Sequence, residues 1–390
     1  MRRPSRPRTS DAPSRLAAEP RLDIPLPPAL GPALCRDLSR ALGHEWLVTN
    51  GLGGYASSTI VGANTRRYHG LLVAATRPPG GRAVLLAKLE ETVVMPGARY
   101  DLSTNRYPGV IHPEGYQYQE QFRMDPWPTF VYRLPGLVLE KQVCMLPQEN
   151  TTVVSYTLRQ ASGAIELLLR PLIACRDFRW VSQENATFQT RVEQGPGTLV
   201  MHPYEGLPPL VLHHGAELFE PAAYWYKHFE YLEEVATEEV HDEDLYSPGQ
   251  LLYLLRPGEA AQLIASTTRI PASHWSSLVP RATEWRVEIL RRPLARGFGP
   301  LTTWLVHAAD QVLVKALDGT RHVIAGYPDQ PVSGRELLIG LPGLALATDQ
   351  QEVARDLLQT MASHCRDGLL PVRFTEEDGS PEYDYVDTSL

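Results

Sequence analysis

Short apolar runs rich in β-branched, aromatic and leucine residues follow one another from Pro25 to Arg269. Gly, Pro, Asn and Asp interrupt these runs about every ten residues, a spacing typical of an antiparallel β-sandwich. Pro135-Gly136 predicts a tight turn between two of the runs, because proline fixes φ and glycine tolerates positive φ. We therefore predict a β-sandwich over residues 25–270. Its clearest strands are 68–76, 82–94, 130–134, 137–145, 152–158 and 165–170.

The apolar period changes to that of helices after about Ala272. Residues 271–300 are predicted to be a linker that carries a helix, and residues 301–390 the first helices of a truncated α-domain. The last helix should begin at an N-cap formed by Thr348 or Asp349 and stop near Gly368. The predicted helices are 276–292, which ends before the Pro293–Pro300 segment, 301–317, 336–347 and 350–364.

The chain has 390 residues, of which 43% are hydrophobic, and a net charge of −8. That length suits two domains and excludes a wholly disordered protein. The acidic balance gives no reason to expect a nucleic-acid partner. Residues 1–24 are expected to be a disordered basic, proline-rich extension. They lack the apolar stretch that a signal peptide or a membrane anchor requires. We therefore expect no membrane association.

Three groups of residues bear on cofactors and metals. Cys35, Cys144, Cys175 and Cys365 are widely spaced and form no metal or redox motif, so we interpret them as free, mostly buried thiols in the cytoplasm. Residues 50–54 (NGLGG) resemble a dinucleotide-binding loop only superficially, because the residues after them favour a strand rather than a helix. We expect no cofactor and no metal. His112, His202, His307 and His364 are isolated and are expected to be structural.

The segments 224–234 (YWYKHFEYLEE) and 241–244 (HDED) mix aromatic rings with carboxylates. That mixture suits sugars, whose C–H faces stack on aromatic rings while their hydroxyls bind acids. The alternative is an aromatic strand that ends in a solvated acidic turn, and it is favoured because runs of charge are usually solvated.

Two stretches near the N-terminus, residues 45–56 (EWLVTNGLGGYA) and 64–74 (NTRRYHGLLVA), resemble the start of the bacterial and archaeal glycogen debranching enzymes of the amylo-α-1,6-glucosidase type. The resemblance runs from Gly43 to the last residue. Other parts of that family's N-terminal domain are similar to 176–177, 225–226, 229–231 and 243–249, and the opening of its catalytic domain is similar to 325–328, 334–335, 341–344, 367–371, 373–374, 383 and 386–387.

The resemblance implies a supersandwich packed on an (α/α)6 barrel of six helical hairpins. It also implies hydrolysis of α-1,6-linked glucose at the branch points of glycogen or another branched α-glucan. Inverting hydrolysis requires two carboxyls about 6.5 to 9.5 Å apart. In the family both come from later hairpins, so we assign no catalytic residue in this chain.

Substrate-binding residues that the resemblance implies are Tyr327, Arg335, Glu336 and Asp387. This chain has Ser333-Gly334-Arg335-Glu336 where the family has Trp-Gly-Arg-Asp, so a stacking ring is lost and the carboxylate moves by one methylene. Arg335 keeps a guanidinium that can donate two parallel hydrogen bonds. The alternative for Arg335 and Glu336 is an ion pair at a helix N-terminus. Arg66, Arg67 and Tyr68 are expected to define a strand entry or to lie at the interface between sandwich and barrel.

We therefore expect a debranching-enzyme homologue that lacks its catalytic acid and base and is inactive alone. A partial barrel would expose helix faces, so the chain should be marginally stable, aggregate, or need a separate polypeptide that supplies the rest of the barrel. The alternatives are a non-catalytic glycan-binding paralogue and another six-hairpin glycosidase of the glucoamylase kind.

Overall fold

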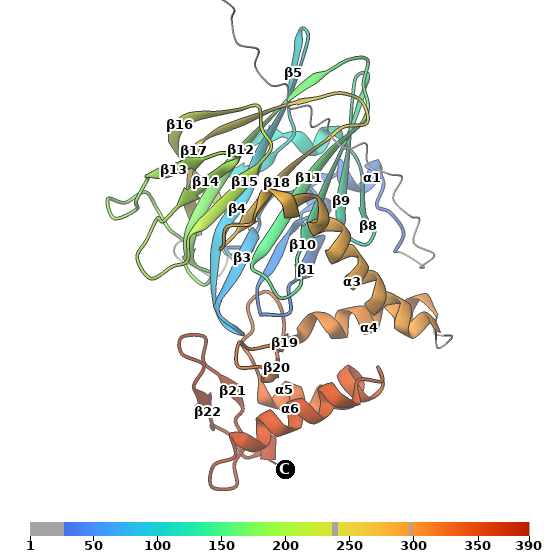
Figure 1. Cartoon of the computed structure of the whole chain (residues 1–390), viewed down its shortest axis with the longest axis vertical. Coiled ribbons are helices and arrows are strands. Elements are labelled where there is room, and N and C mark those ends of the chain that lie inside the picture. The colour runs from blue at the N-terminus through green and yellow to red at the C-terminus, as the bar shows by residue number, and fades with distance from the viewer. Residues whose placement is uncertain (1–26, 236–240, 296, 298, 390) are drawn as a thin grey trace, which may run out of the picture.

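The computed structural model describes residues 27–235, 241–295, 297 and 299–389. Two antiparallel eight-stranded sheets form the upper part of the molecule in Figure 1, and the helical part lies below them. The predicted β-sandwich is thus confirmed as a large antiparallel domain. The predicted extension over residues 1–24 lies outside the described residues.

The first sheet contains the residues that face the helical part of the molecule. Its long central strands β4 and β12 pair along most of their length, and β5 adds to the outer end of β4. In spatial order its strands are β1 (Glu45–Thr49), β2 (Tyr55–Thr59), β3 (Gly70–Arg77), β4 (Gly80–Met95), β12 (Ile165–Asp177), β17 (Asp242–Leu255) and β16 (Leu218–Glu230), with β5 (Ala98–Asp101) beside β4.

The second sheet packs on the inner face of the first. Its strand β10 has the predicted bounds, and the turn at Pro135-Gly136 joins it to β9. In spatial order its strands are β13 (Val192–Gly195), β14 (Thr198–Met201), β15 (Leu210–His214), β18 (Ala260–Ser266), β11 (Thr151–Gln160), β10 (Leu137–Met145), β9 (Pro128–Leu134) and β8 (Gln119–Met124).

Smaller elements surround the sandwich. Two short helices within the segment predicted to be all β are α1 (Pro32–Cys35) and α2 (Leu38–Ala41); the side chain of Asp37 caps α2 by accepting from Arg40 N. A two-stranded ribbon, β6 (Thr104–Tyr107) with β7 (Val110–Glu114), pairs separately. Short 3-10 turns span Gly115–Tyr118, Ala272–His274 and Asp387–Ser389.

The main hydrophobic core lies between the two sheets. It consists of the inward-facing residues of both sheets and includes Leu278 and Ala282 from the helix α3 (Trp275–Ala295). A second apolar cluster covers the outer face of the first sheet, around Tyr55 and Phe178, and Tyr327 from the helical part packs on it. Burial of apolar surface therefore holds α3 against the main core and Tyr327 of the helical part against the outer face of the first sheet.

The helical part contains α4 (Pro300–Val312), α5 (Gly334–Leu341) and α6 (Gln351–Ser363), together with a π-helical turn over Pro342–Leu346. Two short hairpins accompany these helices: β19 (Leu313–Lys315) with β20 (Arg321–Val323), and β21 (Arg373–Phe374) with β22 (Pro381–Glu382). Figure 1 shows β19 and β20 between the helices and the lower edge of the sandwich, and β21 and β22 beside α5 and α6. The elements beyond the sandwich therefore include strands that the helical periodicity did not predict.

Several predicted helix ends are wrong. The α3 helix continues through Pro293, and α4 ends at Val312 because residues 313–315 pair as a strand with β20. The predicted helix 336–347 begins two residues earlier, at Gly334, and its last part, Pro342–Leu346, is π-helical because Pro342 has no amide hydrogen for a regular helical bond. Gln350, not Thr348 or Asp349, is the N-cap of α6, since Asp349 has a φ of 63°, and α6 stops at Ser363.

His322 on β20 makes the stability of the helical part depend on pH. Burial lowers the pKa of its imidazole to about 4, and the ring lies edge-on to Phe374 at 5.2 Å. The folded state keeps His322 neutral while the unfolded state binds a proton, so stability should fall as the pH drops from about 6.5 to about 4. We expect the acid-induced fall in the free energy of unfolding to be smaller in His322→Gln, by on the order of 1–3 kcal/mol. Urea unfolding at pH 7 and pH 4.5 tests this, and equal pH dependence in both proteins would contradict it.

No helix among the described residues combines the length and the apolar composition that crossing a bilayer requires.

Candidate functional site

The N-terminus of α5 carries two of the predicted sugar-binding residues. Ser333 is its N-cap, and the Ser333 hydroxyl accepts a hydrogen bond from Glu336 N at 3.3 Å. That hydroxyl also contacts the Glu336 carboxylate, so Ser-x-x-Glu forms a relative of the capping box. Ser333, at the position where the resemblance implies a tryptophan, therefore provides a helix cap.

Close packing holds this helix end in place. A Cβ atom on Gly334 would lie 2.2 Å from Pro371 O and 2.6 Å from Met361 Cε, so only glycine fits there. The amides of Gly334 and Arg335 both donate to Val372 O, at 2.9 and 3.1 Å. The start of α5 is therefore fixed against the segment that enters β21.

Charged side chains lie at this helix end and on the hairpin that adjoins it. Arg335 and Glu336 lie 3.6 Å apart with side chains 45% and 44% exposed, so both are partly open to solvent. On the adjoining hairpin Arg373 pairs with Glu382 and lies 3.6 Å from Asp384. Guanidinium and carboxylate groups in such an arrangement can donate to and accept from sugar hydroxyls.

The structure describes the side chain of only one of the other two predicted sugar contacts, Tyr327. Tyr327 packs edge-on against Tyr55 with ring centroids 5.4 Å apart, and its hydroxyl is buried without a hydrogen-bond partner among the described residues. Burial raises the pKa of Tyr327 above its usual value. Asp387 begins the turn Asp387–Ser389, but its side chain lies outside the described residues.

Arg66, Arg67 and Tyr68 lie on the sandwich side of the junction with the helical part. Arg66 pairs with Glu45 at 2.7 Å, and Arg67 Nη2 donates to the Tyr68 hydroxyl at 3.0 Å. The Tyr68 carbonyl accepts from the hydroxyl of Tyr55, the ring on which Tyr327 packs. Tyr68 thus contacts a residue on which the helical part packs, and the interface role of all three residues stays a prediction.

Arg82, at the start of β4, is the junction residue that sequence reasoning missed. Its side chain is fully buried and pairs with Glu376, in the loop between β21 and β22. Its guanidinium also donates to Pro328 O at 2.7 Å and Gln330 O at 2.8 Å. An arginine that opens a predicted strand gives no signal of such contacts, because they come from residues more than 240 positions away.

The acidic segment predicted to be a solvated turn is instead part of strand β17. Glu243 is fully buried, and Arg176 Nη2 donates to it at 2.8 Å. Tyr231 donates to the same carboxylate, and Ser182 N does so at 3.1 Å. The neighbouring aromatic segment is strand β16, as predicted. Glu243 is therefore a structural anion whose hydrogen-bonding capacity is taken up by the protein.

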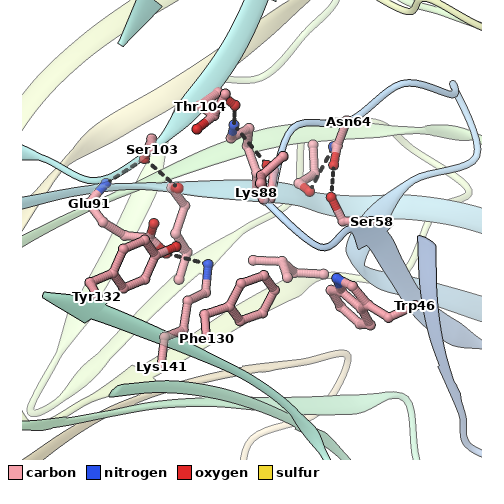
Figure 2. Close-up of a pocket in the computed structure, with 15 residues that line it drawn as sticks. Trp46, Ser58, Asn64, Lys88, Glu91, Ser103, Thr104, Phe130, Tyr132 and Lys141 are labelled. Carbon is pink, nitrogen blue, oxygen red and sulfur yellow. Dashed lines mark hydrogen bonds and ion pairs between the residues drawn. The ribbon is translucent and has the colours of Figure 1, made fainter. Parts of the chain in front are cut away.

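A small polar cavity lies inside the sandwich, between the two sheets. Figure 2 shows Lys141 pointing toward Glu91, with which it forms an ion pair, and Lys88 donating to Thr104 O at 2.9 Å. Burial lowers the pKa of Lys88. The cavity has room for about one water molecule and is lined by core side chains such as Trp46 and Phe130. It is too small for a sugar, so we place the candidate site at α5.

Comparison with protein-family models identifies the two halves of the chain. Residues 44–262 match the model "Glycogen debranching enzyme N terminal", and residues 307–390 match the model "Amylo-alpha-1,6-glucosidase". The chain belongs to the glycogen debranching enzyme family. The resemblance predicted from the sequence is thus confirmed, and with it membership of a glycoside hydrolase family. A search of curated proteins found no match.

Two solved structures are similar to this member of the debranching enzyme family. One is a bacterial glucoamylase complexed with acarbose, at 8% identity and a TM-score of 0.46, covering 88% of this chain and 51% of the glucoamylase. The other is a protein described as a putative kojibiose phosphorylase from the human microbiome, at 9% identity and a TM-score of 0.38, covering 87% of this chain and 46% of that protein. The chain therefore spans about half the length of each.

Proposed function

We propose that this chain takes part in the hydrolysis of α-1,6-linked glucose at the branch points of glycogen or a similar α-glucan, with Arg335 and Glu336 contacting the sugar. The observation that carries the proposal is the half-exposed pair Arg335–Glu336 on a helix end that Gly334 fixes in place. Membership of the debranching enzyme family supports the choice of substrate. Tyr327 and Asp387 are proposed as further sugar contacts.

We propose that the general acid and base lie outside these residues and that the chain alone binds glucan without hydrolysing it. A general acid at neutral pH needs a carboxyl whose pKa is raised. Burial raises the pKa of Glu90 and of Asp310, but Glu90 lies on β4 and Asp310 on α4, whereas Arg335 and Glu336 lie on α5. The proposal is supported by the placement of these two carboxyls.

Exposed leucine and isoleucine side chains on the helical part support a need for further helices. Leu301 and Leu305 on α4 are 74% and 60% exposed, Ile339 on α5 is 68% exposed, and Leu358 on α6 is 46% exposed. Apolar faces of this kind are normally covered. We propose that a separate polypeptide covers them and completes a barrel of six helical hairpins.

We also propose that the protein works in the cytoplasm, because its four free cysteines would stay reduced there.

Calorimetric titration with maltooligosaccharides tests the sugar-binding role of Arg335. We expect Arg335→Ala to weaken binding about 10- to 100-fold, because it removes charge-assisted hydrogen bonds. Arg335→Lys should recover only part of the affinity, since an ammonium cannot donate two parallel bonds. The matched control is Arg355→Ala on α6, an exposed arginine beside Asp356. Unchanged affinity in Arg335→Ala, or an equal loss in the control, would contradict the proposal.

Glucose release from a branched limit dextrin tests the inactivity of the isolated chain. We expect no release above background. Release that Arg335→Ala abolishes would show that the acid and base lie within these 390 residues.

A non-catalytic glycan-binding role is the second candidate. It is favoured by the contact between Ser333 and Glu336, which engages the carboxylate in capping α5. The two functions differ in one outcome: adding a polypeptide that supplies further helices of the barrel should give hydrolysis for the enzyme and only binding for the paralogue.

A further inference from the structure

Trp180 is a large aromatic side chain that the sandwich leaves open to solvent. Its side chain is 66% exposed, although an indole ring buries more apolar area than almost any other residue when it is packed in a core. The residue lies in the loop that begins where β12 ends at Asp177. Because the indole ring of Trp180 is largely exposed to solvent, a ligand can contact it.

The loop that carries Trp180 is held rigidly on both sides. Before it, Arg179 N donates to Asp177 Oδ1 at 2.9 Å, and Arg179 Nη2 lies 3.0 Å from the second oxygen of the same carboxylate. After it, Ser182 N donates to buried Glu243 at 3.1 Å, and Asp244 N donates to Ser182 O at 2.9 Å. Trp180 is therefore presented by an ordered loop, which lowers the entropy cost of binding a ligand.

An ion pair connects this loop to the hairpin beside the candidate site. Arg179 pairs with Glu377, in the loop between β21 and β22. Glu377 follows Arg373 by four residues, so the Cα atoms of the two are separated by at most about 14 Å. Arg373 bridges to Ser333, the N-cap of α5, and interacts electrostatically with the exposed Tyr385. The hairpin thus connects the loop of Trp180 to the N-cap of α5, two residues before Arg335.

The groups along this path suit a carbohydrate chain better than a protein partner. Single exposed rings, Trp180 and Tyr385, stand at its two ends and are 66% and 65% exposed. Between them lie partly exposed ion pairs such as Arg179–Glu377 and Arg373–Glu382. Separate aromatic faces stack on the C–H faces of sugar rings, and charged groups meet the hydroxyls, whereas a protein interface is centred on a continuous apolar patch.

We propose that Trp180 forms a stacking subsite, contributed by the sandwich, for the α-glucan chain whose terminal sugar contacts Arg335. The subsite rests on the proposed function and adds chain-length preference to it. The subsite therefore predicts that a chain of seven glucose units gains a contact at Trp180 that a disaccharide at Arg335 lacks.

Calorimetric titration of the full chain with maltose and with maltoheptaose tests the subsite. We expect Trp180→Ala to weaken maltoheptaose binding about 5- to 20-fold and to change maltose binding less than about twofold. Trp180→Phe should recover part of the loss, because a smaller ring still stacks. Tyr224→Ala is the matched control, since Tyr224 is a 61% exposed aromatic residue on another element, β16, and it should change neither affinity. Thermal melts of each variant check that the fold is kept.

The outcomes separate the subsite from the proposed function. Suppose that Arg335→Ala weakens the binding of both sugars. If Trp180→Ala then leaves both affinities unchanged, or lowers both equally, the subsite is overturned and the proposed function stands. An equal loss in Tyr224→Ala also overturns the subsite. If the unchanged chain binds neither sugar, the subsite and the proposed function both fail.

Discussion

Replacing Arg82 with alanine is expected to lower the free energy of unfolding by about 3–5 kcal/mol and to loosen the helical part from the sandwich. The arginine side chain is fully buried at the junction, and the Glu376 side chain is only 10% exposed. Removing the cation would leave this carboxylate without its charged partner. The carbonyls of Pro328 and Gln330 would lose their donors as well.

Differential scanning calorimetry and limited proteolysis would measure the effect of Arg82→Ala. We expect the helical part to melt in a separate transition at lower temperature and to be cleaved first, since two coupled domains unfold together only while their interface holds. Arg77→Ala is the matched control, because Arg77 lies on the same β3–β4 hairpin but is exposed. A single transition at the original temperature would show that Arg82 does not hold the junction.

Glu243→Ala is expected to destabilise the sandwich by about 3–5 kcal/mol, because it leaves the Arg176 guanidinium buried without a counter-charge. Glu243 is fully buried, and the Arg176 side chain is 6% exposed. Neither can recover its hydrogen bonds from water. Tyr231 and Ser182 would also lose their common acceptor.

Urea unfolding would measure the loss in Glu243→Ala. Glu243→Gln should fall between this variant and the original protein, since an amide still accepts hydrogen bonds but carries no charge. The control is Glu149→Ala, which breaks the ion pair with Arg281 at the surface and should change stability little. A loss in Glu243→Ala no larger than in this control would contradict the burial argument.

Local sequence signals were sufficient where a segment's neighbours in space are also its neighbours in the chain. The predicted strand 137–145 is β10, and the turn at Pro135-Gly136 joins it to β9. The glycine-rich segment 50–54 is a turn followed by strand β2, as the β-prone residues after it predicted. Hairpin pairing and turn chemistry are local, so periodicity and a proline-glycine pair suffice to predict them.

Local signals failed where distant residues decide the outcome. Residues 313–315 have a helical pattern but form β19, because they pair with β20 and because Lys315 N donates to Gly51 O in the sandwich. The acidic residues of 241–244 were predicted to be solvated, but Arg176 on the neighbouring part of the first sheet draws Glu243 into the interior. Tertiary hydrogen bonds and ion pairs override local propensity in both segments.

Some features of the candidate site could be predicted from the sequence, and others became visible only in the tertiary structure. Motif residues identified the debranching enzyme family and pointed to Arg335 and Glu336, because a resemblance is a property of the sequence alone. The sequence by itself therefore determined the family, the sandwich and the helical character of the C-terminal part. Only the tertiary structure decided that Ser333 caps α5, that Arg82 fastens the two parts together, and that Trp180 stays exposed. The contacts of Arg82 and the setting of Trp180 depend on residues far apart in the chain, and they exist only once both parts have folded.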